Sequence, residues 1–178
     1  MEREGIVMKS VFTAGLGLLV CMAIPVEIAA AQAVDPACSS ENSLGFTQTL
    51  HCGGVTIVAE SGAHYTLHRG RQGRVDAVEL DSKAVLIEVP AKPSGNKFEV
   101  ITPQAIAAVR GTKWAVDVNG DKSSVFVVRG HVGVVRRTGG RGVALQRGEG
   151  VDVEPGGALA VKRWSPARVS ALLARLGQ

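Results

Sequence analysis

Aromatic residues are scarce in this chain of 178 residues, which has two Trp, one Tyr and four Phe. Proteins that bind single-stranded nucleic acid stack the bases on aromatic side chains, so the composition argues against a nucleic-acid partner. The charged residues are scattered and give a formal charge of +4, which is typical of a solvated surface. The 46% of hydrophobic residues suffice for the core of one domain, and the 22 glycines indicate many tight corners.

The sequence also lacks a recognisable catalytic or metal-binding pattern. No Gly-x-Ser-x-Gly nucleophile elbow is present. The closest histidines, His64 and His68, lie in a segment with strand character, where a rise of ~3.3 Å per residue separates them by about 13 Å. We therefore expect no enzymatic activity, no metal site and no cofactor. A wall-modifying hydrolase is the enzymatic alternative, and it would need an acid/base pair that the sequence does not reveal.

The N-terminal segment has the features of a secretory signal peptide. Lys9 precedes the apolar run Val11–Val26, and Ala31–Ala33 has the small-x-small form of a cleavage site. We expect residues 1–33 to be removed and the mature chain to be periplasmic. The alternative is an uncleaved membrane anchor, because the segment Ser10–Gln32 is long enough to span a bilayer.

Two cysteines, Cys38 and Cys52, follow the predicted signal peptide, while Cys21 lies within it. In an oxidising compartment, two cysteines separated by a short loop favour a disulfide. Such a bond stabilises a fold by roughly 3 kcal/mol through its effect on the unfolded state. The segment Val34–Thr49 is polar, so we expect residues 34–53 to form an irregular lead-in that the disulfide holds in place.

Short runs of strand-forming residues, separated by glycine, proline or aspartate, predict an all-β domain over residues 54–163. The expected early strands are Val55–Ala59, Tyr65–His68, Arg74–Leu80, Ala84–Val89 and Lys97–Ile101. Further along the chain, the dipeptide Asn119-Gly120 is flanked by alternating apolar residues. This pattern predicts a β-hairpin with a two-residue type I′ turn.

In the second half of the chain, Arg-Gly recurs with steps of 19 and 18 residues, with the glycines at Gly111, Gly130 and Gly148. Each glycine lies between two strand-like runs, so we expect each to form a corner with positive φ. Repetition at this spacing favours solenoid-like coils that stack on their neighbours. Ordinary hairpins in a β-sandwich are the alternative, because glycine also marks turns and bulges there.

The segment Thr102–Val118 contains the pattern Thr-Pro-x-x-x-x-Ala-Val-Arg-Gly-Thr-x-x-x-Val. This pattern resembles the core motif of FecR-type periplasmic domains, which are known from iron-citrate signalling at the bacterial envelope. The resemblance extends from about Gly54 to about Val153, most of the expected mature chain. It implies a twisted β-solenoid fold in the periplasm.

Full FecR-type regulators also carry a cytoplasmic sigma-factor-binding segment, a transmembrane helix and a further periplasmic subdomain. In this sequence Met1–Ser10 is too short for the cytoplasmic segment, and no further subdomain follows Gly156. These departures from the family plan count against direct regulation of a sigma factor. The resemblance implies that this chain corresponds to the extracytoplasmic recognition part of such a regulator.

Residues 164–178 predict a short amphipathic helix, with Ser165 as its N-cap and Pro166 at its first position. Its apolar residues follow at helical spacing and form one stripe, namely Val169, Leu172, Leu173 and Leu176. A helix of about eleven residues is marginal alone, so this stripe must be buried. We favour burial at the open end of the chain's own sheet, where the helix would cover strand edges. A docking helix for another envelope protein is the alternative.

Together these features predict an all-β protein, twisted solenoid-like or sandwich-like, with a short C-terminal α-helix. We expect a non-catalytic periplasmic module for envelope sensing or signalling, which binds a protein or a glycan through sheet surfaces or edges. A membrane-anchored signalling component and a structural wall protein are the alternatives. Contact with a membrane is expected only if the N-terminal segment is not cleaved.

Overall fold

The computed structural model describes residues 38–43, 47–70, 73–91, 97–109 and 111–178. The chain divides into two units, Met1–Gln32 and Ala33–Gln178, and every described residue belongs to the second. The predicted signal peptide lies outside the described residues. Within the described ranges, no helix is long and apolar enough to cross a membrane.

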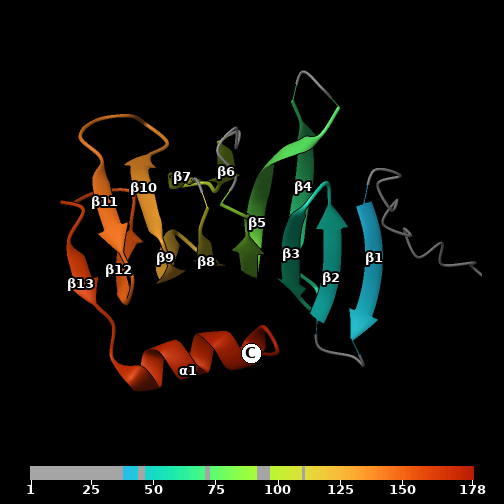
Figure 1. Cartoon of the computed structure of the whole chain (residues 1–178). Helices are drawn as coiled ribbons and strands as arrows, with labels where there is room; N and C mark the ends of the chain where they lie inside the picture. Colours follow the sequence, from blue (N-terminus) through green and yellow to red (C-terminus); the bar gives the residue numbers. More distant parts are fainter. Residues whose placement is uncertain (1–37, 44–46, 71–72, 92–96, 110) are drawn as a thin grey trace, which may run out of the picture. The chain divides into compact units, whose positions relative to one another are not determined.

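The described residues form thirteen strands and one helix (Figure 1). The first strands are β1 (Cys38–Ser43), β2 (Thr47–Cys52), β3 (Val55–Glu60), β4 (His64–Arg69), β5 (Val75–Glu88), β6 (Phe98–Ile101) and β7 (Ala105–Val109). The others are β8 (Lys113–Asn119), β9 (Lys122–Arg129), β10 (His131–Arg136), β11 (Val143–Gln146), β12 (Glu149–Val153) and β13 (Val161–Arg163), followed by α1 (Pro166–Arg175). The predicted all-β fold with a short C-terminal helix is confirmed.

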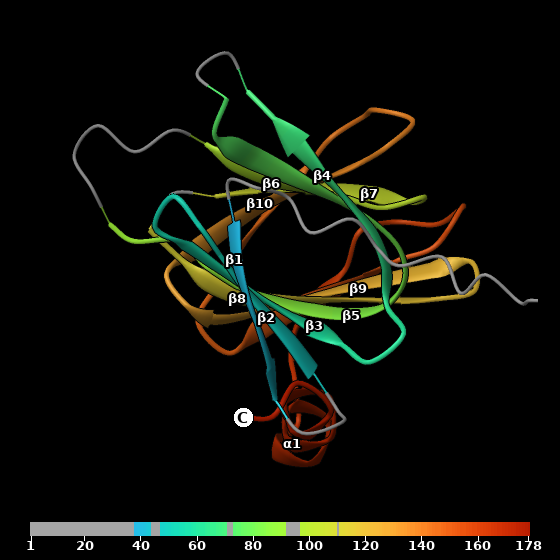
Figure 2. The same ribbon diagram turned by 90° about the vertical axis from the view of Figure 1, so that its right-hand side faces the viewer.

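The strands form two sheets that face each other across one core (Figure 2). Sheet A has the order β1-β2-β3-β5-β8-β9-β12-β13, and sheet B has the order β4-β5-β6-β7-β10-β11. β5 belongs to both sheets, because its first half pairs with β4 and β6 and its second half with β3 and β8. Apolar side chains from both sheets alternate into the core, where Leu80, Phe98 and Trp114 are among the largest fully enclosed.

Of the two architectures predicted, the strand pairing corresponds to the sandwich. Neighbouring described strands pair antiparallel, except for the parallel pair β5 and β6. Stacked coils of a β-solenoid would instead repeat parallel pairs. The corner glycines connect the two sheets: Gly111 joins β7 to β8, Gly130 joins β9 to β10, and Gly148 joins β11 to β12. Their φ angles of 61°, 91° and 82° lie in the left-handed region that favours glycine.

β5 differs from the prediction of two separate strands, Arg74–Leu80 and Ala84–Val89, with Asp81–Ser82 between them. It is continuous and bends at Lys83, the one described non-glycine residue with positive φ, at 65°. Ser82 still pairs with β4 of sheet B, whereas Lys83 pairs with β8 of sheet A. The predicted break between two strands is therefore a bend at which one strand passes from one sheet to the other.

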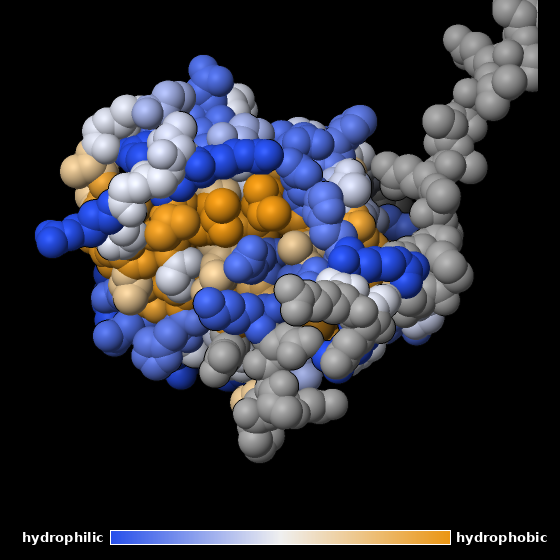
Figure 3. Space-filling view, turned by 90° about the horizontal axis from the view of Figure 1, so that it is seen from above, coloured by the Kyte–Doolittle hydropathy of each residue, from blue (hydrophilic) through white to orange (hydrophobic). Residues whose placement is uncertain are grey.

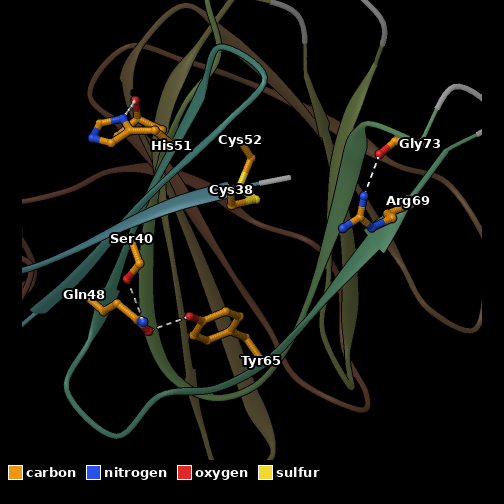
Figure 4. Close-up of a disulfide and its surroundings, with 9 residues drawn as sticks. Cys38, Ser40, Gln48, His51, Cys52, Tyr65, Arg69 and Gly73 are labelled. Carbon is orange, nitrogen blue, oxygen red and sulfur yellow. Dashed lines mark hydrogen bonds between the residues drawn. A yellow bond between two sulfur atoms is a disulfide. The ribbon is translucent and has the colours of Figure 1, made fainter. Parts of the chain in front are cut away.

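The described residues of the segment Val34–Thr49 are not irregular as predicted, because they form β1 and the start of β2 at the edge of sheet A. These strands were not predicted because their sequence is polar, whereas strands are predicted from an alternation of apolar and polar residues. Cys38 and Cys52 lie directly opposite each other in this pair and form a disulfide, with 4.4 Å between their Cα atoms (Figure 4). The disulfide thus joins two neighbouring strands of the sheet.

The predicted hairpin joins β8 to β9, but its turn is displaced by one residue. Asn119 pairs with Lys122, so the two loop residues are Gly120 and Asp121. Only Gly120 has positive φ, at 57°. Positive φ at the first loop residue alone corresponds to a type II′ turn, so the type I′ prediction is wrong.

α1 packs on the outer face of sheet A, not on the strand edges that were predicted to receive it (Figure 2). Ser165 caps the helix by accepting a hydrogen bond from the N–H of Arg168 at 3.4 Å. Leu172 and Leu176 are buried against the sheet, and Val169 and Leu173 are partly buried beside them. The sheet contributes a short list of apolar residues, Ala84, Leu86, Ala115 and Phe126.

Two arginines that lie off this apolar stripe fasten the helix at both ends. Near its start, Arg168 binds both carboxylate oxygens of Asp152 on β12, at 3.0 and 2.5 Å. Near its end, Arg175 pairs with Glu60 on β3 at 2.6 Å and with Asp117 on β8 at 2.9 Å. The stripe considered as a docking surface is therefore occupied within this chain.

Candidate functional site

The outer face of sheet B has no covering element among the described residues, whereas α1 covers the outer face of sheet A. Figure 3 views this side of the molecule and shows a strip of hydrophobic residues bordered by hydrophilic ones. An apolar surface that a folded domain leaves uncovered, with a polar rim, is typical of a binding surface.

Alternation along the strands decides which side chains reach this surface. In β6, Phe98 and Val100 are buried in the core, so Ile101 points outward. In β7 the same alternation leaves Ile106 and Ala108 outside the core. With the corresponding positions of β10 and β11, the sheet-B face consists of Ile101, Ile106, Ala108, Gly133, Val135 and Ala144.

Strand register arranges these residues in rows across the sheet. Ile101 lies opposite Ile106, which lies opposite Val135, so three β-branched side chains form one continuous row. A second row consists of smaller residues: Ala108 lies opposite Gly133, which lies opposite Ala144 on β11. Val135 is 38% exposed, and among the described large apolar residues only Val161 is equally exposed. The sheet-B face is therefore a flat aliphatic surface with Val135 as its most accessible large residue.

An ion-pair network borders one end of the face. Nη1 of Arg137 lies 3.0 Å from Oε1 of Glu79, and Nε2 of His68 lies 3.0 Å from Oε2 of the same carboxylate. Two hydrogen bonds hold the pKa of Glu79 below its usual value, and the one from Arg137 has a larger effect than the one from His68. Arg137 also donates to the carbonyl of Thr102 at 3.3 Å, which fixes the network beside the β6–β7 turn.

Glu99 supplies the unpaired charge of this surface. It lies on β6 opposite Ala108, is half-buried, and has no hydrogen-bond or ion-pair partner among the described residues. A partner surface that is apolar and carries one basic residue would match both features. The described residues of the sheet-B face are aliphatic or small, and none of them is aromatic.

The corner glycines have a structural role rather than a place on this face. A Cβ atom at Gly130 would lie 2.7 Å from Oγ1 of Thr112 and 3.0 Å from the carbonyl oxygen of Gly111. Oγ1 of Thr112 donates to the carbonyl of His131 at 3.0 Å. The Gly-Thr of the motif therefore packs the first corner directly against the second.

The Thr-Pro end of the same motif shapes the β6–β7 turn. Oγ1 of Thr102 accepts a hydrogen bond from the N–H of Ala105 at 2.9 Å. Ser123 on β9 lies 2.8 Å from this hydroxyl and donates to Oε1 of Gln104 at 2.6 Å. This buried polar cluster ties the turn in sheet B to sheet A. The residues of the motif therefore stabilise the fold. The sheet-B face could not be predicted from the motif, because it depends on which surface the tertiary fold leaves uncovered.

The other residues considered for chemistry do not converge. His64 and His68 lie on β4, the strand expected for them, and His68 belongs to the Glu79 network. Across the described ranges, no group of three His, Cys, Asp or Glu residues is placed to hold a metal ion. The described polar groups around the sheet-B face form its rim.

Comparison with known proteins agrees with this architecture. Residues 54–133 match the family described as FecR protein, so the resemblance carried by the Thr102–Val118 segment is confirmed. The matched segment runs from the turn before β3 into β10 and includes the first two corners. No curated protein matches the chain.

Two solved structures from Parabacteroides distasonis, each provisionally described as an anti-sigma factor, are similar in fold. The first has a TM-score of 0.56 and 19% identity, and the alignment covers 72% of this chain and 61% of that one. The second has a TM-score of 0.48 and 18% identity, with coverage of 76% and 60%. At this identity the first likeness concerns the fold alone, and this chain matches about three fifths of the length of each neighbour.

Proposed function

We propose that this protein is a non-catalytic FecR-domain module that acts in envelope signalling by binding a protein partner through the sheet-B face. The observation that carries this proposal is the face itself, which is aliphatic, uncovered by described elements and flanked by the unpaired Glu99. The FecR match supports a role in signalling, and the description of the first structural neighbour as an anti-sigma factor points in the same direction.

A periplasmic location is part of this proposal. The segment at residues 1–33 has the pattern of a signal peptide, and the Cys38–Cys52 disulfide suits an oxidising compartment. N-terminal sequencing of the protein from fractionated cells tests it. A soluble periplasmic chain that begins near Val34 supports export with cleavage. An intact chain in the membrane fraction would support the anchored alternative.

A matched pair of variants tests the binding surface. Val135→Lys places a charge in the row of β-branched residues, and Val161→Lys places the same charge on β13, where the native valine is equally exposed at 38%. Because both positions are on the surface, both variants should fold. Affinity capture followed by mass spectrometry should recover a protein with the native chain and with Val161→Lys, but not with Val135→Lys. Recovery of the same protein with all three chains, or of glycan alone, would contradict the proposal.

A further inference from the structure

The four free edges of the two sheets are not equally protected against pairing with another strand. β13 has three residues, two of them Lys162 and Arg163, and β11 has only four. β4 has six residues, but register shifts interrupt its ladder at both ends. Short length, positive charge and bulges are the usual devices that block an edge. Each of these three edges therefore has at least one of them.

β1 is neither short nor bulged, and it carries no positive charge. Its six residues pair with β2 without interruption, and it contains no Lys, Arg or Pro. Its single charged residue is Glu41, which is exposed and makes no hydrogen bond or ion pair within the described part of the chain. On its other side β1 pairs with no described strand. Among the edges that the described strands form, it is the longest regular one.

The distance between Cys38 and Cys52 shows which backbone groups of β1 are free. In antiparallel strands, directly opposite residues lie about 4.5 Å apart at a non-hydrogen-bonded pair and about 5.5 Å apart at a hydrogen-bonded pair. The 4.4 Å between these Cα atoms assigns them to a non-hydrogen-bonded pair. By alternation, Ser39 and Glu41 bond to β2. The N–H and C=O groups of alternate residues point outward, namely those of Cys38, Ser40 and Asn42.

Side-chain contacts hold this edge in place. The disulfide fixes one end of β1, and Nε2 of Gln48 donates to Oγ of Ser40 at 3.2 Å. The hydroxyl of Tyr65 on β4 donates to Oε1 of Gln48 at 2.7 Å, so the chain of contacts reaches sheet B (Figure 4). A strand held in its extended form loses little conformational entropy when another strand adds to it.

We propose that β1 is a strand-addition site that binds an extended segment of a partner protein with a basic residue beside Glu41. In this mode of recognition, main-chain hydrogen bonds supply the affinity and side chains supply the preference. A second folded copy is a poorer occupant, because a six-residue edge provides much less than the ~1,200 Å² that stable interfaces bury. β1 and the sheet-B face share no residues, so the site does not depend on the proposed function.

A synthetic peptide tests the site directly. The probe is a capped hexapeptide of Val and Thr with one central Lys, titrated into the isotope-labelled full chain and followed by NMR. We expect the amides of Cys38, Ser40 and Asn42 to shift and gain protection from hydrogen exchange. The amides of Ser39 and Glu41 should be protected before the peptide is added. The same peptide with Glu in place of Lys should bind up to about fivefold more weakly, the size of a cross-strand charge pair.

Variants of β1 separate strand addition from other binding. Ser40→Pro removes one outward N–H without removing a bond to β2, and it should weaken binding about tenfold, as expected for one lost hydrogen bond. Ser40→Ala is its control and should bind like the native chain. Glu41→Lys should reverse the preference so that the Glu peptide binds more tightly, which keeps the test valid if the proline variant fails to fold.

Three results would overturn the proposal. The first is the absence of any shift in β1 amides at millimolar peptide, and the second is equal binding of both peptides to both Glu41 forms. The third is protection of the outward amides that rises with protein concentration alone, because this would show that a second copy occupies the edge.

Discussion

The guanidinium carbon of Arg168 lies 3.5 Å from the centre of the Trp164 ring. The Trp164 ring also stacks on the ring of Phe126 on β9, with 5.1 Å between the ring centroids and 22° between the ring planes. Since Arg168 also binds Asp152, this one side chain joins helix, tryptophan and β12. The contact explains how a helix of ten residues keeps a fixed position on sheet A.

Removing this side chain should loosen the helix. We expect Arg168→Ala to lower the free energy of unfolding by about 1–2 kcal/mol, a value that allows for the partial exposure of the ion pair. Arg147→Ala is the control, because Arg147 is exposed and makes no hydrogen bond or ion pair with described residues. Denaturant unfolding monitored by tryptophan fluorescence measures both. Equal stabilities of the two variants would show that the Arg168 contacts contribute nothing.

The Asp152–Arg168 pair should also make stability depend on pH. Burial alone raises the pKa of Asp152, but hydrogen bonds from Arg168 and Ser124 outweigh it and hold the pKa below its usual value. A carboxyl group whose pKa is lower in the folded state adds stability above its unfolded pKa of about 3.9. That contribution is lost as the pH falls below this value toward the folded pKa.

Comparison with Asp152→Asn isolates this effect. The native chain should be more stable than the variant at about pH 6, and the difference should shrink as the pH falls below about 4. Melting temperatures measured across this range give the result. A difference that does not change with pH would contradict the assignment.

The close approach at the second corner can be tested by two alanine substitutions. Gly130 and Gly139 have nearly equal φ angles, 91° and 88°, but only Gly130 has neighbours where a Cβ atom would lie. Gly139→Ala should therefore cost only the backbone strain of about 1–2 kcal/mol. Gly130→Ala should cost an additional 1–3 kcal/mol, roughly, because the methyl group meets Thr112. Thermal unfolding measures the stability of both variants. Equal losses of stability would contradict a steric clash at Gly130.

The disulfide between Cys38 and Cys52 should stabilise the edge of sheet A. Replacing both residues by alanine should lower the free energy of unfolding by about 2–4 kcal/mol. Peptide mapping of the unreduced native protein should recover the two cysteines in one linked fragment. Free thiols at both positions would exclude the disulfide, whatever the stability of the double variant.

The features that local sequence determines were predictable. The cap at Ser165, the apolar stripe of the helix and the three corner glycines each depend on neighbouring residues, and the structure places them as local chemistry requires. The strands β3 and β6 were also predicted, each with a bound that differs by one residue from the prediction. These signals are strong because one face of each element is buried in the core.

Features that depend on contacts between distant segments were not predictable. β1 is polar because it lies at a sheet edge, and Asp81–Ser82 resembles a turn although β5 continues through it. Arg168 lies off the apolar stripe of the helix, and its ion pair with Asp152 depends on the fold, which brings β12 beside the helix. The sheet-B face was missed for the same reason, because alternation shows that Ile106 lies on a strand but not that its outer side is left uncovered.

Site-specific photo-crosslinking at Val135 in intact cells tests the central claim most directly. A photoreactive residue at position 135 should form a covalent adduct with one protein, and the same residue at Val161 should not, although both native side chains are 38% exposed. Glu99→Lys, combined with the probe at position 135, should reduce the yield because it repels the basic residue expected on the partner. Adducts of equal yield from both positions, or no protein adduct from position 135, would contradict the account.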